Sequence, residues 1–388
     1  MVLKLLKYEL KKLLQFKVTM GILAVFTIIL FGLFSTSFFS GQISGYSSNP
    51  IHGKEAAMIN KEIAESHSGY LTDDLIRDIF DDYARRQPEL KKKGVYNVFE
   101  HMTIYQFVKK PTDMLEKINS SSKVLHFKNI KLLPHKALGS TLPLNQLKHG
   151  NFAPWNQLYS VLDTVYMVII LTTLFICAPI FSGDYENKMN SILLNTKLGR
   201  NKLTLTKFIT CFLSASCIFV LSNSIVLVVF GQYFTWSGWD TSVQLNLYWI
   251  NHIFNMLSFP IHLNLRDVLL LLLLYQYIGL LFISGIGILV SSLTRKPLVS
   301  YAISVLLYFA PEFLLKVFQD GIVNKLLTCL SINTSELDGL LLKYSNMTSS
   351  GFFFENFWVN GIITLLIKII ILILALRLTY LNQLRRES

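Results

Sequence analysis

Six long apolar stretches constrain this chain more than any other feature of its sequence. A helix of about 20 apolar residues crosses the roughly 30 Å hydrocarbon layer of a membrane, and a helix satisfies its own backbone hydrogen bonds there. Charged residues make up only 15% of the chain, below the roughly 25% usual for soluble domains. The sequence therefore predicts an all-α integral membrane protein with six transmembrane helices, at roughly 18–39, 158–181, 208–231, 267–291, 297–318 and 357–380.

The positions of lysine and arginine predict how these helices are oriented. Basic residues gather in short cytoplasmic loops, and here they cluster before the first stretch, after the second, between the fourth and fifth, and after the sixth. In a chain with six spans all four positions fall on one side, so we expect both termini to be cytoplasmic. The segment 41–157 then lies outside. It is also rich in basic residues, but long translocated domains largely escape the charge rule.

The N-terminal segment 2–16 is predicted to form an amphipathic helix before the first span. Placed at 100° per residue, its leucines share one arc and its lysines the opposite arc, which is typical of a helix lying in the inner membrane interface. The alternative is a positively charged topology signal with no mechanical role. The basic arc contains Lys4, Lys7, Lys11 and Lys12, and the apolar arc contains Leu3, Leu6, Leu10, Leu13 and Leu14.

The segment 41–157 resembles a soluble domain, and we expect it to be mostly helical. Thr72 is a candidate helix cap, and a second helix is expected over 95–109, while 123–150 suits either strands or short helices. None of the four cysteines lies in this segment, so no disulfide framework is expected there, which fits a bacterial cell envelope. The first of these helices carries charges that suit its macrodipole, Asp73 and Asp74 in the first turn and Arg85 and Arg86 in the last.

No enzyme signature is found in the chain. The phosphate-binding loop, zinc-protease, nucleophile-elbow and dinucleotide patterns are all missing from the sequence. The eight histidines are scattered rather than spaced as metal ligands, and nothing indicates a nucleic-acid partner. We therefore expect no catalytic residues, no metal site and no ATP bound by this chain itself.

The segment 181–207 is the most specific polar feature between two spans. An ordinary cytoplasmic loop can be about five residues long, but this one is about 25 residues with a helical stripe of its own. We expect Gly183 to break the second span and Gly199 to end a short helix that follows. The segment is predicted to be a docking surface; an ordinary loop is the alternative. Its stripe consists of Glu186, Met189, Asn190, Leu193, Leu194 and Lys197.

Three charged residues within the later spans also stand out. Lys368 lies near the middle of the last span, where a charge usually faces a cavity or a partner. It is a candidate for the substrate path and could pair with Asp163; the alternative is a lysine that snorkels to the interface. Glu312 and Lys316 lie one turn apart and are expected to pair. The segment 319–356 is apolar enough to form two short helices, either dipping into the outer leaflet or capping the surface.

In its architecture the chain resembles the membrane subunits of ABC exporters of the ABC-2 class. Those subunits have an interfacial elbow helix, six spans, cytoplasmic termini, a coupling helix between the second and third spans, and a helical hairpin before the last. The first external loop is longer here than in compact members, and is similar to that of members with an inserted external domain, found among bacterial peptide, antibiotic and sodium exporters. The residues that match the family's coupling segment are Glu186, Leu193, Leu194, Thr196, Arg200 and Lys207.

The resemblance implies a permease subunit in a bacterial cell membrane. It would export an amphipathic substrate, such as a peptide, an antibiotic or a lipid-like molecule, as a dimer driven by a separate ATPase that binds ATP and Mg²⁺. Its parts would be 1–40 with the elbow helix, 41–157 outside, and 158–388 with a coupling helix over 183–200. The residues that contact the ATPase would be Glu186, Met189, Asn190, Leu193, Leu194, Lys197 and Arg200.

Two other functions compete with this expectation. One is a non-transporting membrane sensor or immunity protein whose external domain binds a peptide. The other is a secondary transporter, which is weakened by the scarcity of acidic residues inside the spans and by the lack of an evident inverted repeat.

Overall fold

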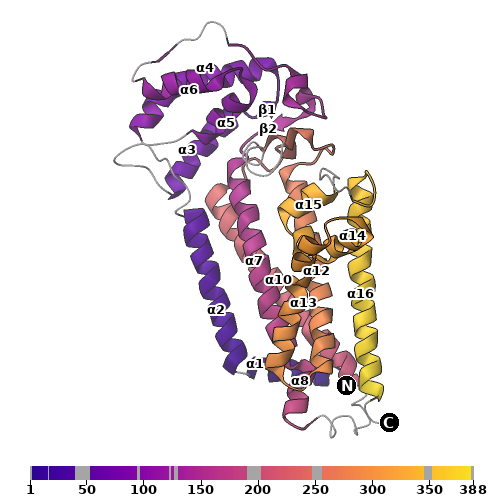
Figure 1. Cartoon of the computed structure of the whole chain (residues 1–388). Helices are drawn as coiled ribbons and strands as arrows, with labels where there is room; N and C mark the ends of the chain where they lie inside the picture. Colours follow the sequence, from indigo (N-terminus) through magenta and orange to yellow (C-terminus); the bar gives the residue numbers. More distant parts are fainter. Residues whose placement is uncertain are drawn as a thin grey trace. The chain divides into compact units, whose positions relative to one another are not determined.

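The computed structural model confirms an all-α membrane protein, and the residues that it describes form six helices long and apolar enough to span a membrane. It describes residues 2–15, 17–39, 53–93, 97–121, 124–125, 130–189, 202–246, 256–344 and 352–385. The candidate spans are Met20–Phe39, Ala153–Glu186, Thr204–Phe234, Leu265–Leu293, Pro297–Val317 and Phe357–Leu384. They occur in the predicted order, and Figure 1 labels the helices that form them.

The chain divides into two compact units, and the division passes through four of the spans. The first unit contains Met1–Leu30, Asp163–Ser224 and Leu272–Ser388. The second contains Phe31–Leu162 and Ile225–Leu271. Helices α2 (Lys17–Leu33), α7 (Ala153–Cys177), α10 (Thr204–Phe234) and α12 (Leu265–Leu293) each contribute residues to both units.

The first unit is a bundle of apolar helices. It includes α1 (Val2–Gln15), α8 (Pro179–Glu186), α13 (Pro297–Val317) and α16 (Phe357–Arg385), together with parts of α7, α10 and α12. Gly279 of α12 marks a close approach to α7, because a Cβ there would lie 2.4 Å from the Tyr166 hydroxyl. Helix α1 confirms the amphipathic helix expected over 2–16.

Two short helices precede the last span, as the apolar pattern of 319–356 predicts. They are α14 (Gly321–Leu330) and α15 (Leu337–Tyr344), joined by the 3₁₀ helix η7 (Ile332–Ser335). Leu340 and Leu341 of α15 are buried, whereas Ile322 of α14 is 62% exposed. Apolar burial therefore holds α15 inside the unit, while α14 leaves an apolar face uncovered among the described residues.

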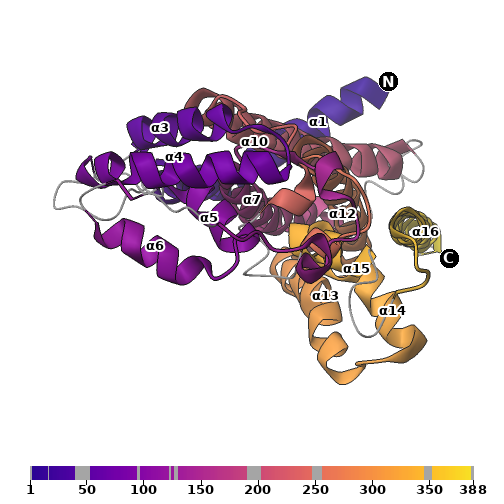
Figure 2. The same ribbon diagram turned by 90° about the horizontal axis from the view of Figure 1, so that it is seen from above.

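The second unit contains a small helical domain. Its helices are α3 (Gly53–Ser66), α4 (Asp73–Lys92), α5 (Val98–Phe107) and α6 (Pro111–Ser120), with short 3₁₀ helices η2 (His135–Leu138), η3 (Leu144–Gln146), η5 (Val243–Leu245) and η6 (Met256–Ser258). Helix α4 packs against α5 and α6, and α5 packs against α3 (Figure 2). The strands β1 (Gly69–Tyr70) and β2 (Lys148–His149) pair antiparallel. The π-helix η1 (Phe34–Phe39) continues α2.

Helix α4 begins where the sequence predicts and ends later. The Leu75 N–H donates to Thr72 Oγ1 at 3.2 Å, which confirms the cap. The prediction that Arg85 and Arg86 form the last turn is wrong, because α4 continues through Pro88 to Lys92. Leu90 is buried and packs with Ile63 of α3, and this apolar contact stabilises the helix beyond the proline.

Two other local predictions concern helix α5 and the region 123–150. Helix α5 confirms the helix expected over 95–109. The ambiguous region 123–150 forms 3₁₀ turns and strand β2, and Leu132 makes an isolated bridge to Val108. Residues 126–129 lie outside the described part of the chain.

A buried histidine lies in the core of this domain. His149 of β2 stacks on Phe99 with ring centroids 4.5 Å apart, and its Nε2 lies 2.8 Å from Thr103 Oγ1. Because the Thr103 hydroxyl donates to the Phe99 carbonyl, the imidazole is the donor to Thr103. Burial, followed by the charge of His67, lowers the pKa of His149 to about 3. The domain core therefore holds this ring neutral.

Candidate functional site

The end of the second span is broken one turn earlier than predicted. The sequence indicates a break at Gly183, but Gly183 lies inside α8. Helix α7 ends at Cys177 and α8 begins at Pro179. Proline has no N–H to continue the hydrogen-bond ladder and is tolerated in the first turn of a helix, so Pro179 is the physical cause of the break.

Helix α8 is held at its first turn by a serine from another span. Ser291 of α12 accepts from the N–H groups of Phe181 at 3.0 Å and Ser182 at 3.1 Å, and donates to the Ala178 carbonyl at 2.6 Å. The first N–H groups of a helix have no partner within the helix. Ser291 supplies that partner and so fixes the α7–α8 break to α12.

The last turn of α8 is also well defined. Met189 N–H donates to the Asp184 carbonyl at 2.9 Å, and Lys188 N–H to the Tyr185 carbonyl at 3.0 Å. Lys188 is in the left-handed region with φ 55°. This is the hydrogen-bond pattern of a Schellman cap. The expectation that Glu186 and Met189 share one helix is therefore wrong: Glu186 ends α8 and Met189 lies past the turn.

A carboxylate on α8 binds two lysines from two other helices. Asp184 is 1% exposed; one of its oxygens pairs with Lys207 of α10 and the other with Lys12 of α1. Lys207 is 3% exposed and also lies over the Phe181 ring, 4.5 Å from its centroid. One buried ion pair and one partly buried ion pair thus join α1, α8 and α10 through a single residue.

Glu9 of α1 completes this charged cluster, one turn before Lys12. It is 3% exposed. Burial raises the pKa of Glu9, although the positive charges of Lys207 and Lys12 oppose that shift. Burial also acts to lower the pKa of Lys12, but the hydrogen bond and charge of Asp184 outweigh it, so that the pKa of Lys12 is raised. Lys12 therefore stays charged in the cluster.

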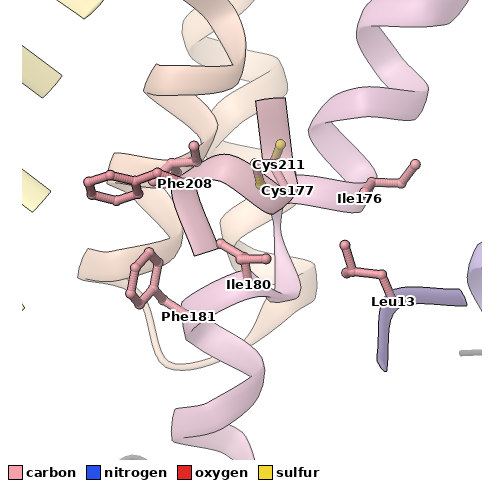
Figure 3. Close-up of a cluster of buried hydrophobic side chains, with 8 residues drawn as sticks. Leu13, Ile176, Cys177, Ile180, Phe181, Phe208 and Cys211 are labelled. Atoms are coloured by element: carbon pink, nitrogen blue, oxygen red, sulfur yellow. The ribbon is translucent and has the colours of Figure 1, made fainter. Parts of the chain in front are cut away.

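The charged cluster rests on an apolar one. Leu13 of α1 belongs to a cluster of buried apolar side chains that also includes Ile176, Ile180, Phe181 and Phe208 of α10 (Figure 3). The pair Cys177 and Cys211 lies in the same apolar cluster. The apolar cluster therefore includes residues of α1, α8 and α10, the three helices that the ion pairs join.

Helix α8 reaches the last span as well. Gln383 of α16 donates to the Tyr185 hydroxyl at 3.2 Å, and α8 packs against α13. Helix α8 is therefore the point where α1, α10, α12, α13 and α16 meet. It leads directly into the segment that the sequence predicts to be a docking surface.

Only some of the residues predicted for the docking segment and the elbow helix belong to the described part of the chain. Glu186 and Met189 are described, with Met189 40% exposed, while Asn190, Leu193, Leu194, Thr196, Lys197 and Arg200 lie outside the described residues. Of the elbow lysines, Lys4, Lys7 and Lys11 are exposed, and Lys12 turns inward to Asp184. Asp184 itself is absent from the predicted site residues. The sequence signal for Asp184 was an acidic residue at the end of the second apolar stretch, with Lys207 just before the third.

The expected pairing of Lys368 with Asp163 is wrong, although both side chains bind the same short segment. Lys368 is buried and donates to Thr334 Oγ1 at 2.9 Å and Ser335 Oγ at 3.0 Å. Asp163 accepts from Gln276 Nε2 at 3.1 Å and from the Leu337 N–H at 3.2 Å. Hydroxyl oxygens accept from the Lys368 ammonium, whereas amide N–H groups donate to the Asp163 carboxylate.

Glu312 makes a third contact with this segment, so its expected pairing with Lys316 is also wrong. Glu312 accepts from Ser331 Oγ and from Asn333 Nδ2, while Lys316 lies over the Phe313 ring. Polar side chains from α7, α13 and α16 thus hold residues 331–337. Irregular backbone at membrane depth is stable only where protein surrounds it, and these contacts supply that surrounding.

Comparison with known proteins identifies the family. A family model described as ABC-2 family transporter protein matches residues 3–382. Comparisons with curated proteins and with solved structures gave no match. The family match covers both units and nearly the whole chain, so this multi-pass membrane protein is a permease of the ABC-2 transporter family.

Proposed function

We propose that the chain is the membrane subunit of an ATP-driven exporter in a bacterial cell membrane, with cytoplasmic termini. It works as a dimer with a separate ABC ATPase, which binds ATP and Mg²⁺. The observation that carries the proposal is the buried Asp184 cluster. It ties α1 and α10 to α8, the element that leads into the basic segment between the second and third spans.

The cluster explains how a push at the membrane surface would reach the spans. The ATPase docks on Glu186, Met189, Asn190, Leu193, Leu194, Lys197 and Arg200. Force on this segment acts on the end of α8. Asp184 passes it to α1 and α10, and Ser291 passes it to α12, so that ATP-driven closure becomes a rigid-body movement of packed helices.

The substrate path is assigned to the interior of the first unit. Lys368 and Asp163 both hold residues 331–337, and in this proposal a substrate leaving through the bundle displaces this segment. Displacement would free the Lys368 ammonium and the Asp163 carboxylate to face the substrate. An amphipathic substrate, such as a peptide, an antibiotic or a lipid-like molecule, suits a path with both apolar walls and these charges.

Co-purification tests the docking assignment. The tagged chain is isolated from the membranes of its own cell, and any bound ABC ATPase is identified by mass spectrometry. We expect the wild type to retain an ATPase, and Glu186→Ala and Leu193→Asp to retain at least about fivefold less, a loss of about 1 kcal/mol in binding. Glu89→Gln, an exposed acid on α4, is the matched control and should bind like the wild type.

The result that overturns the proposal is specific. If both variants kept full ATPase binding, the docking segment would be misassigned. If the wild type retained no ABC ATPase at all, the non-transporting sensor would replace the exporter.

A further inference from the structure

Helix α1 presents a row of lysines on the face that points away from the protein. Lys4, Lys7 and Lys11 are exposed, and at 100° per residue they lie within about 60° of one another around the helix. Glu9 and Leu13, on the opposite face, are 3% and 5% exposed. The first unit therefore covers the inner face of α1, and the lysine row stays accessible to a partner outside the chain.

The connections of α1 place this row at a membrane surface. Helix α1 leads into α2, where the first span begins at Met20, and Lys12 pairs with Asp184 near the end of the second span. Figure 1 shows α1 running crosswise to α16, beside α8. A helix held across the ends of two spans lies at the level of the lipid headgroups.

The charge of the lysine row is not neutralised by the part of the chain that the structure describes. Its three lysines make no ion pair with another described residue, and Glu9 is the only acid in α1. Because Glu9 lies on the opposite face, the row carries a single sign of charge. That sign is complementary to an anionic surface.

The side chains beside the row favour a lipid surface over a soluble acidic protein. Leu3 is 79% exposed and Tyr8 is 60% exposed. Exposed leucine, tyrosine and lysine together are typical of a helix at the membrane interface, where apolar groups enter the bilayer and ammonium groups meet the headgroups. An acidic protein would pair with the lysines but would give Leu3 no apolar surroundings in water.

We propose that the lysine row of α1 binds the headgroups of anionic phospholipids. The row places three positive charges along about 10 Å of helix, and each lysine near an anionic membrane strengthens binding about fivefold. Because Lys12 of the same helix pairs with Asp184, lipid bound to the row would also hold α1 against α8. The proposal requires neither an ATPase nor transport.

Hydrogen exchange of the full-length chain in nanodiscs tests this proposal at α1 itself. One set of nanodiscs contains phosphatidylcholine alone, and the other contains about 30% phosphatidylglycerol, which is anionic. Binding to the folded helix slows its opening, so we expect the α1 amides of the wild type to exchange at least about tenfold more slowly with phosphatidylglycerol. The triple variant Lys4→Gln, Lys7→Gln, Lys11→Gln should show a difference of less than about twofold. Glutamine and lysine have similar helix propensities, so both chains should exchange alike in phosphatidylcholine.

Two further triple variants serve as controls. Replacing Lys4, Lys7 and Lys11 by arginine keeps the charge and should keep the lipid effect. The second removes three exposed lysines from the helical domain and should also behave like the wild type. Its substitutions are Lys92→Gln, Lys109→Gln and Lys117→Gln.

Three results would overturn the proposal. The first is equal exchange of wild-type α1 in the two kinds of nanodisc, and the second is a lipid effect that survives the glutamine variant. The third is loss of the effect in the arginine variant, which would show that charge is not what the lipid recognises. If the glutamine variant kept the lipid effect but lost a co-purifying ATPase, the row would instead be a protein docking surface.

Discussion

At the scale of single residues, Asp184 is where the membrane subunit concentrates its buried charge. Its two oxygens hold one lysine each, from α1 and from α10. Such pairs add little net stability when compared with apolar replacements, but removing one partner leaves the other charge buried and uncompensated. Asp184 is therefore better understood as a link between helices than as a source of stability.

Replacing Asp184 by asparagine should destabilise the first unit by about 3–5 kcal/mol, because Lys207 would stay buried without the carboxylate that it pairs with. Thermal unfolding in detergent measures the loss. The double variant Asp184→Asn with Lys207→Met should recover part of it. Asp240→Asn removes an acid from a half-exposed pair with Lys148 and should change stability by no more than about 1 kcal/mol. Equal unfolding temperatures for the two single variants would contradict the role given to Asp184.

His149 should make the helical domain sensitive to acid. Its pKa in the fold is about 3 against a usual value of 6.5, so the unfolded state binds the extra proton. Stability is therefore present above pH 6.5 and is lost as the pH falls toward 3. Between pH 7.5 and 5 the loss is about 2 kcal/mol. Hydrogen exchange of α5 at the two pH values measures it.

The control for this pH effect is His149→Phe. It keeps an aromatic ring on Phe99 and removes the titrating group. The variant should lose about 2 kcal/mol less than the wild type over the same pH range. An unchanged pH dependence would assign the acid sensitivity to groups other than His149.

At the scale of elements, α8 is short, and its position is determined by its neighbours. Pro179 starts it, Ser291 of α12 satisfies its first N–H groups, and a Schellman cap ends it. Pro179 and the cap are local to the segment, whereas Ser291 belongs to another span. The ends of α8 are therefore set locally, and its position is fixed by α12.

Ser291→Ala should therefore act on α8 rather than on its own helix. The Phe181 and Ser182 N–H groups would lose their acceptor, which corresponds to about 1–3 kcal/mol for a buried group left unsatisfied. Ser284→Ala is the matched control, because Ser284 is equally buried but bonds only within α12, to the Leu280 carbonyl. Thermal unfolding should distinguish the two variants. If their unfolding temperatures fell equally, Ser291 would not be holding α8.

The elements also show how far sequence reasoning reaches. The spans, α1 and the Thr72 cap of α4 follow from periodicity and capping chemistry, which are local. The end of α4 does not, because Leu90 packs on α3 and the helix continues past Pro88. The end of α8 does not either, because Lys188 occupies a left-handed position usually given to glycine.

The site was predictable only where it depends on composition. A polar segment between two spans is visible in the sequence, but the partners of a buried charge are not. Lys368 binds hydroxyls of η7, and Glu312 binds Ser331 and Asn333. These contacts arise from helices far apart in the chain, and no spacing rule along one helix identifies them.

At the scale of the whole molecule, the ABC-2 match covers residues 3–382 and so includes both compact units. The first unit carries the charged cluster at α8 and the buried contacts of Lys368. The second unit carries the small helical domain. Force reception and substrate passage are thus proposed for the first unit.

The central claim is that ATP hydrolysis by a partner is coupled to this chain through Asp184. Its most direct test is the ATP hydrolysis rate of the purified complex in nanodiscs, compared with that of the isolated ATPase. The claim predicts that the wild-type and Asp240→Asn complexes share one rate, distinct from that of the isolated ATPase. The Asp184→Asn complex should bind as much ATPase but hydrolyse ATP at the isolated rate. A wild-type rate in the Asp184→Asn complex would contradict the claim.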